Sequence, residues 1–303
     1  MFICISFLAL SDDVYAQFFD KRARYHALAV QGIGSYFYGD VSSGLNTIRS
    51  GAGVEYIYKF SPNASFVTGI NYIRLLGDDD GNSSPADPAT VNKYIRNLHF
   101  RNDVLEWFVQ LRYDVFSSTE HYQKRPSFNI FAGVGLGIIY SNPQAKDSSG
   151  NWTNLQPLQT EGVSYSSFTG FIPLSAGLRY KISNNIDIEF ELSYHITFTD
   201  YLDDVKGTYA DPAALNSESA RYFANRSTEP VNTFDNQSRD LNYIENTLGY
   251  AVLTSPGGYS YISGTGPRQP RGSKIGPDGY FLGMLRFVFI IPQKGISCPR
   301  YRD

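Results

Sequence analysis

Ser193, His195 and Glu191 are the residues of this 303-residue chain whose types and spacing come closest to catalysis. They occupy alternate positions, so an extended strand would place all three side chains on one face. A serine beside a histidine base, with a carboxylate to orient that base, is the arrangement of nucleophilic hydrolases. A lipid hydrolase must turn such a trio toward lipid, whereas the alternation of the surrounding residues turns it inward. Catalysis is therefore a secondary hypothesis, and neither catalytic residues nor a cofactor are expected.

Metal-binding patterns are weak in this sequence. The four histidines lie far apart, and none has the spacing of a zinc site. The segment Asp78-Asp79-Asp80-Gly81-Asn82 offers the oxygen ligands and the glycine of a calcium loop, but it lacks a glutamate at the required downstream position. A solvated loop is the simpler interpretation, and no metal ion is expected.

The elements that carry these residues show a strict alternation of apolar and polar or small side chains. It is clearest from Phe128 to Tyr140 and from Ile186 to Phe198. Segments of about ten alternating residues span an outer membrane as tilted strands, and they exceed the usual strands of soluble proteins. No apolar run approaches the ~20 residues of a membrane-spanning helix, which excludes a helical membrane protein. The alternating segments are about 24–38, 52–60, 66–76, 105–115, 128–140, 172–182, 186–198 and 281–291.

The connections between these segments alternate in length, as they do in outer-membrane barrels. The even number of strands puts both termini on the side of the short turns. The sequence therefore predicts an all-β protein, an eight-stranded antiparallel transmembrane β-barrel in outer-membrane lipid, with short periplasmic turns, long extracellular loops and periplasmic termini. The shorter connections are 61–64, 117–126 and 183–185, and the longer ones are 40–50, 77–97, 141–163 and 200–278.

Charged residues fall on the inward face of the predicted strands. Eight strands enclose an interior just wide enough for side chains to fill, so an open pore is not expected. Unpaired charges there would be costly, which predicts an internal network of salt bridges that holds the barrel shut. The residues assigned to this polar network are Glu55, Glu106, Arg112, Arg179, Glu189, Glu191 and His195, with Lys59, Asp114 and Asp187 on the same face.

The ends of the chain indicate export. Residues 1–16 combine an apolar core with a small-residue cleavage site at Ala16, which is typical of a signal peptide, although the usual basic start is missing. The barrel is assigned to 17–291 and a periplasmic tail to 292–303. The net charge of −3, with both signs interspersed, excludes the basic field that nucleic-acid binding requires.

Cys298 would be the single cysteine after signal removal, because Cys4 leaves with the signal peptide. An odd cysteine in an oxidising compartment either pairs with another protein or stays a free thiol, and both interpretations stay open. Basic residues at both chain ends fall on the same side of the membrane. They predict a docking surface for a periplasmic partner, against the alternative of a solvated tail. The expected contact residues are Lys21, Arg22, Cys298, Pro299 and Arg300.

Several segments together resemble the PorG-type barrels of the type IX secretion system of Bacteroidota. The string Asp200-Tyr201-Leu202-Asp203-Asp204-Val205 is the most specific, and the resemblance covers nearly the whole chain. It marks Asp200, Tyr201, Asp203 and Asp204 as a family motif in an outer loop. The very long final loop departs from the family pattern and leaves room for a different partner. The other segments are 34–40, 96–101 leading to Glu106, 172–174, 177–180 and 298–301.

The resemblance implies a scaffold that attaches a periplasmic ring, including a lipoprotein, to the outer membrane in support of protein secretion and gliding motility. Members of this family are not enzymes. A disulfide through Cys298 would place the tail at the contact with the ring lipoprotein. Two alternatives remain: a lipid hydrolase that uses Ser193 and His195, and an adhesion or ligand-binding barrel that works through its outer loops.

Overall fold

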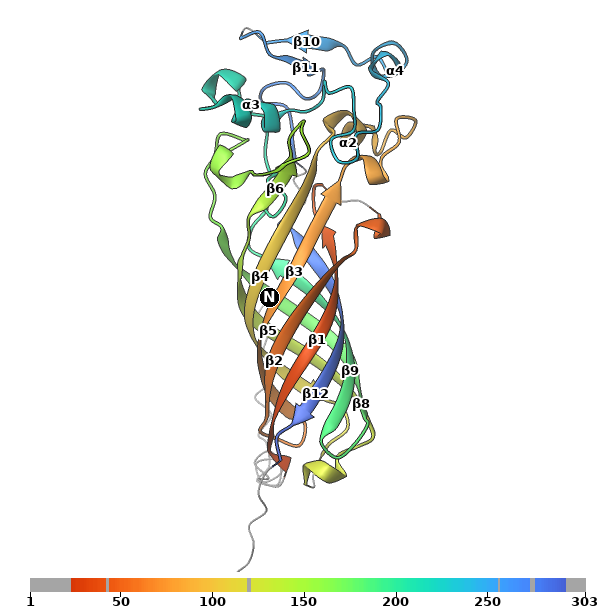
Figure 1. Ribbon diagram of the computed structural model, residues 1–303, viewed down its shortest axis with the longest axis vertical. Coiled ribbons are helices and arrows are strands. Elements are labelled where there is room, and N and C mark those ends of the chain that lie inside the picture. Colours follow the sequence, from red (N-terminus) through yellow and green to blue (C-terminus); the bar gives the residue numbers. More distant parts are fainter. Residues whose placement is uncertain (1–22, 42–43, 119–120, 256, 273–275, 293–303) are drawn as a thin grey trace, which may run out of the picture.

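Long antiparallel strands form the wall of the molecule (Figure 1). The computed structural model describes residues 23–41, 44–118, 121–255, 257–272 and 276–292. The wall contains β1 (Tyr25–Tyr38), β2 (Arg49–Lys59), β3 (Ala64–Asp78), β4 (His99–Asp114), β5 (Phe128–Tyr140), β8 (Phe168–Lys181), β9 (Ile186–Thr197) and β12 (Gly279–Ile290).

The sheet closes on itself. Its strand order is β3-β2-β1-β12-β9-β8-β5-β4, and β4 pairs back onto β3 from Ala64↔Tyr113 to Asp78↔His99. The first and last strands pair over most of their length, with Ala27 opposite Ile290. The predicted eight-stranded antiparallel barrel is therefore confirmed.

Two strands begin four or more residues earlier than the alternation predicts. β4 begins at His99 rather than near Leu105, and β8 begins at Phe168 rather than near Ile172. The early part of β4 pairs with β6 (Pro143–Lys146), which pairs in turn with β7 (Trp152–Asn154). Both His99 and Phe100 are buried, so the alternation from which the strand was predicted is absent at this end.

The two faces of the wall have opposite chemistry. On β4, Leu105 and Trp107 are 50% and 51% exposed, while Glu106 between them is fully buried. A water-soluble protein hides its large apolar side chains, whereas a barrel in lipid displays them and keeps its polar side chains inside. Large apolar side chains face outward in this way on every wall strand, so the molecule is an outer-membrane β-barrel.

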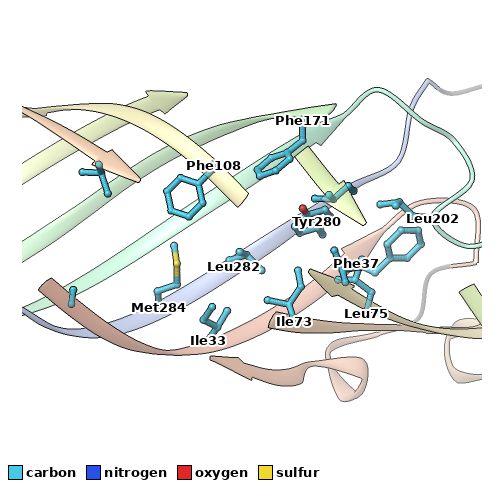
Figure 2. Packing of buried hydrophobic residues seen from close by; sticks show 14 of the residues in the cluster. Ile33, Phe37, Ile73, Leu75, Phe108, Phe171, Leu202, Tyr280, Leu282 and Met284 are labelled. Atoms are coloured by element: carbon cyan, nitrogen blue, oxygen red, sulfur yellow. The ribbon is translucent and has the colours of Figure 1, made fainter. Parts of the chain in front are cut away.

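An apolar layer fills the barrel toward the end where the long loops lie. Figure 2 shows Ile33, Ile73, Phe171 and Leu282 converging from different strands, with Tyr280 close by. These residues belong to one cluster of buried side chains, which Leu202 joins from the loop after β9. The final loop therefore packs into the mouth of the barrel.

The four long loops together form a cap over one end of the barrel (Figure 1). Here the term cap denotes the described parts of the connections β1–β2, β3–β4, β5–β8 and β9–β12. The opposite end has short turns and the 3₁₀ helix η4 (Tyr122–Lys124). Besides β6 and β7, the cap contains η2 (Leu45–Thr47), η3 (Asp80–Asn82), α2 (Val91–Arg96), η5 (Gln156–Leu158), η6 (Pro212–Ala214), α3 (Glu218–Ala224), α4 (Leu241–Asn246), β10 (Val252–Thr254) and β11 (Ser260–Ile262).

The cap has small apolar cores of its own. One joins Val91 and Ile95 of α2 to Ile244 of α4 and Ile262 of β11. Ser217 and Asp240 cap α3 and α4, because each side chain accepts a hydrogen bond from a backbone amide of the first turn. The described parts of the segment 200–278, whose conformation the composition does not predict, are folded over the mouth. Within the described part of the chain, no helix is long and apolar enough to cross a membrane.

The predicted signal peptide at 1–16 and most of the predicted tail at 292–303 lie outside the described residues. These two boundaries stay predictions.

Glycine allows large rings to lie against the inner wall, which leads to a first prediction. A Cβ added to Gly177 would collide with the Phe131 ring and lie 2.6 Å from the carbonyl oxygen of Phe190. Overpacking of this kind costs about 1–3 kcal/mol. We expect Gly177→Ala to unfold at a lower temperature in the gel assay in which a folded barrel migrates faster than the unfolded chain.

Gly32→Ala is the matched control, because nothing lies within 4 Å of a Cβ at Gly32. It should unfold at the temperature of the native chain. Equal unfolding temperatures for the two variants would contradict the proposed role of Gly177.

Candidate functional site

Inward-facing charges form one connected cluster in the barrel, here called the central ion network. Its members come from five strands, β2, β4, β8, β9 and β12, and every one of them is buried. Strand alternation places them there, since their neighbours on each strand face lipid. The network contains Glu55, Lys59, Arg112, Asp114, Arg179, Glu189, Glu191 and Arg286.

Arg286 and Arg112 stand at the centre of this network. Arg286 Nη1 donates to Glu189 Oε2 at 2.7 Å and to Glu191 Oε2 at 2.9 Å, while its Nη2 donates to Glu55 Oε1 at 2.8 Å. Arg112 reaches the same oxygens of Glu189 and Glu191 at 3.1 and 3.0 Å. Two guanidinium groups thus share two carboxylates, which fixes the distances between β4, β9 and β12.

The network continues toward the short turns. Arg179 Nε donates to Glu189 Oε1 at 2.6 Å, and its Nη1 donates to Asp114 Oδ2 at 2.8 Å. Lys59 pairs with the same Asp114 oxygen. Nearer the turns, Arg125 forms a further pair with Asp187 and donates to the carbonyl oxygens of neighbouring turn residues.

The central ion network is electrically balanced. Its four carboxylates, on Glu55, Asp114, Glu189 and Glu191, face four cations, on Lys59, Arg112, Arg179 and Arg286, so four minus four leaves no formal charge. Removing an ion from water costs several kcal/mol, and only close opposite charges with good hydrogen bonds offset that cost. Charged side chains can therefore fill this interior only because the carboxylates and the cations are equal in number.

A second polar group lies between the central ion network and the cap. Glu106 Oε1 is 2.9 Å from His195 Nδ1 and accepts a hydrogen bond from the Tyr280 hydroxyl, while Glu106 Oε2 accepts from Asn71 Nδ2 at 2.9 Å. Gln31 donates to Asn71 and accepts from Arg286 Nε at 2.9 Å. A continuous set of hydrogen bonds therefore links this group to the network.

The structure does not bring Ser193, His195 and Glu191 together as a catalytic trio. The three side chains do lie on the inward face, and all are buried. However, Ser193 Oγ donates to the carbonyl oxygen of Leu174, His195 contacts Glu106, and Glu191 is bound by two arginines. The hydrolase alternative therefore finds no assembled nucleophile here.

Of the residues predicted for the interior, Glu55, Arg112, Arg179, Glu189 and Glu191 lie in the central ion network. Glu106 and His195 lie in the second polar group instead. The prediction missed Arg286, which contacts three of the four carboxylates. Its position between Leu285 and Phe287, both outward-facing, was the signal that could have revealed it.

The predicted family motif ties the cap to the barrel mouth, and we call residues 200–205 the latch. Asp203 accepts hydrogen bonds from the amides of Val41 and Val205 at 2.8 and 3.0 Å. The Leu202 amide donates to Asp278 Oδ2 at 2.9 Å, and the Leu202 carbonyl accepts from Asn102 Nδ2 at 2.8 Å. The latch thereby joins β4, the start of β12 and the first long loop.

Asp204 and Tyr201 extend the latch to the loop between β5 and β8. Asp204 accepts from the hydroxyls of Thr160 and Tyr165 at 2.5 and 2.6 Å. The Tyr201 ring stacks on the Tyr165 ring with centroids 4.5 Å apart. Asp204 adopts a left-handed φ of 66°, a conformation that aspartate tolerates better than most residues. The motif holds the loops in place, and its contacts indicate no chemical reaction.

Two arginines hold the loops to one another. Arg96 binds both oxygens of Asp79 at 2.8 and 2.6 Å and donates to the carbonyl oxygens of Asp40 and Arg271. Arg271 in turn donates to the Asp204 carbonyl at 2.6 Å and pairs with Glu161 at 3.2 Å. All four long loops are therefore connected through buried charged groups.

This arrangement corrects the expectation of a solvated loop at 78–82. Asp79 is fully buried, because its carboxylate is the partner of Arg96, and Asp78 is also buried. In the described part of the chain, no group of three or more histidine, cysteine, aspartate or glutamate residues is arranged to hold a metal ion. Lys21, Arg22, Cys298, Pro299 and Arg300, the predicted contact residues, lie outside the described residues.

Acidic residues crowd at the latch, and this affects their protonation. Burial, and next the charge of Asp40, raise the pKa of Asp203 well above its usual range. Burial and the charge of Asp203 do the same to the pKa of Asp278. Burial and Asp40 raise the pKa of Asp200 to about 6, with Lys206 opposing the shift.

Comparison with known proteins gives a family and a set of similar folds. A family model described as "Domain of unknown function (DUF6089)" matches residues 12–222. No curated protein matches the sequence. The match of the family model includes the latch and all wall strands except β12, and it ends within α3.

Among solved structures, the chain is similar to OprG from Pseudomonas aeruginosa at 8% identity, with a TM-score of 0.40 over 90% of this chain and 98% of that one. It is similar to the attachment invasion locus protein Ail of Yersinia pestis at 8% identity, with a TM-score of 0.39 over 88% and 99%. Neisserial surface protein A gives 7% identity and a TM-score of 0.40 over 87% and 96%.

The central position of Arg286 generates a second prediction. Arg286→Met keeps much of the side-chain volume but leaves Glu55 with Arg112 alone, at 3.7 Å. Breaking a buried ion network on one side costs about 3–5 kcal/mol. We expect a loss of this size in the free energy of unfolding, measured by tryptophan fluorescence during urea titration of the barrel in lipid vesicles.

Arg74→Met is the matched control, since the Arg74–Asp103 pair is 40% and 30% exposed. An exposed pair contributes at most about 1 kcal/mol. A loss in Arg286→Met no larger than that of this control would show that the network does not stabilise the barrel.

The latch carboxyls give a third prediction, on pH. Because their pKa values are raised in the folded cap, the folded cap binds protons more tightly than an opened cap, so its stability falls as pH rises. For Asp200 this loss spans the interval from about pH 4 to the raised pKa near 6. We expect hydrogen-exchange protection factors of the amides at 202–205 to fall across that interval.

Asp278→Asn should flatten this dependence, because an amide oxygen can still accept from the Leu202 amide while the charge beside Asp203 is gone. Protection that instead increases with pH in the native chain would refute this account of the latch.

Proposed function

The chain belongs to the family described as "Domain of unknown function (DUF6089)", and because this description names no activity, we propose a function from the construction of the barrel. In this proposal the barrel is a closed anchor that holds a periplasmic assembly at the outer membrane. In this proposal the short turns face the periplasm and the cap faces outward, as in other outer-membrane barrels. The single observation that carries it is the balanced central ion network.

The filled interior favours an anchor over a channel. The network and the second polar group are buried, and the apolar cluster packs against them, since the Phe171 ring stacks on the His195 ring. Eight-stranded barrels of this width are filled by side chains. An interior filled in this way is not suited to transport. Its ion pairs connect the strands and stiffen the wall, and a fixed attachment point needs a stiff wall.

The partner is proposed from the resemblance to PorG-type barrels. Two of the segments that carry it, residues 96–101 and 200–205, lie at the mouth and connect the loops. The resemblance favours a ring of the type IX secretion machinery that contains a lipoprotein. The contact would lie on the short-turn side, where Lys21, Arg22, Cys298, Pro299 and Arg300 are expected.

Neither alternative replaces this proposal. A lipid hydrolase would need Ser193 and His195 to cooperate, and their hydrogen bonds go to different partners. Ligand binding through the outer loops is compatible with anchoring, because the cap and the short turns lie at opposite ends of the barrel (Figure 1).

A fourth prediction tests the anchor through the tail. In cells that depend on this protein, a non-reducing gel with mass-spectrometric identification should reveal an adduct between the native chain and a periplasmic ring lipoprotein. Cys298→Ser should abolish the adduct, and deletion of residues 293–303 should reduce secretion severalfold while the barrel still reaches the membrane.

Ser297→Ala is the control, because it alters the neighbouring side chain and leaves the thiol in place. If no adduct forms and secretion is normal after the deletion, the tail does not hold the ring. If in addition no ring subunit co-purifies with the barrel, the anchor proposal fails as a whole.

A further inference from the structure

The cap contains a pocket of about 250 Å³ between α3, the segment that begins at Tyr209, and β11 with the turn that follows it. Glu218, Arg221, Tyr222 and Asn225 line one side. Their spacing of three, four and seven places them on one face of α3 and its C-terminal cap residue. The pocket is slightly smaller than the roughly 300 Å³ at which sites for drug-sized ligands begin, so it fits a ligand of one or two rings.

Tyrosine rings form the walls of this pocket. Tyr222, Tyr259 and Tyr261 line it; Tyr259 is exposed, and the other two are partly buried. A Cβ on Gly266 would lie 2.5 Å from the Tyr261 ring, and one on Gly257 would lie 3.1 Å from the Tyr259 ring. These glycines therefore let the rings lie against the backbone. Partly open aromatic faces with a hydroxyl at the edge suit ligands that are apolar on one side and polar at their rim.

Arg221 supplies the positive charge of the pocket lining and Glu218 the negative one, and no ion pair joins the two within the described chain. Its Nη1 donates to the Leu215 carbonyl at 2.7 Å, and its guanidinium lies over the Tyr259 ring at 5.5 Å. Its Nε is buried without a hydrogen-bond partner, and among the described residues Arg221 forms no ion pair. The cap arginines Arg96, Arg226 and Arg271, in contrast, each bind a carboxylate.

The Arg221 side chain is only partly buried, and the accessible edge of a guanidinium binds carboxylate or sulfate groups with charge-assisted hydrogen bonds. Asn225 is held in place beside it, because its Nδ2 donates to the Thr265 carbonyl at 2.7 Å. Glu218, on the same face, can accept hydrogen bonds from hydroxyl groups. Together these groups call for a ligand with a negative charge, several hydroxyls and an apolar ring face.

We propose that this pocket binds a short acidic saccharide, whose carboxylate or sulfate pairs with Arg221 and whose ring packs on Tyr259 and Tyr261. The site is independent of the anchor proposal, since it lies in the cap and uses none of the residues of the short-turn side. The two proposals therefore fail separately.

A fifth prediction tests the site by calorimetric titration of the full-length barrel in detergent, carried to millimolar sugar. The probes are cellobiouronic acid and cellobiose, which have the same two rings and differ in a carboxylate. We expect the acidic disaccharide to bind at least about tenfold more tightly, in line with the strength of a charge-assisted hydrogen bond. Arg221→Gln should remove that difference, and Arg221→Lys should restore part of it.

Tyr259→Ala should weaken both sugars, because it removes the ring of a residue that is 38% exposed at the pocket. Arg49→Gln, a change at an arginine outside the pocket, should leave binding unchanged. The faster gel migration of each folded variant verifies that it is intact. The proposal is overturned if neither sugar binds, if the two bind equally, or if acetate competes as well as the acidic disaccharide.

Discussion

A charge in the side-chain-filled interior of a narrow barrel loses most of its hydration, so it must find an opposite charge within reach. This constraint decides which side chains the inward positions can hold. Arg286 is acceptable on β12 only because Glu189 and Glu191 stand on β9 and Glu55 on β2. The pairs in turn fix the register of the strands that carry them, since a slip of one residue would turn each charge toward lipid.

The same constraint operates at the mouth, with loops in place of strands. Asp79 is fully buried because Arg96 binds both of its oxygens, and Arg271 compensates Asp204 and Glu161. The wall and the cap are thus built by one principle. They differ in strictness: the central ion network is balanced, whereas the latch keeps an excess of carboxyls that favours protonation.

The wall could be predicted from the sequence and the cap could not, for a physical reason. Alternation repeats along each strand, so the inward positions of Glu189 and Glu191 follow from their neighbours alone. Arg286 obeys the same rule between Leu285 and Phe287, and was missed because the prediction for that strand considered its apolar face. The pairing of Arg96 with Asp79, or of Asp203 with Val41, joins loops that share no period. Such contacts depend on where the closed wall brings the loops.

The latch also fixes an order of assembly. The contact of Asp203 with Val41 in the latch, like that of Arg96 with Arg271 beside it, connects residues far apart in the sequence, and the pairing of β1 with β12 brings their loops together. Closing such long loops early would cost entropy with nothing to offset it. We therefore expect the wall to close first, so that a folded cap is the sign of a closed barrel.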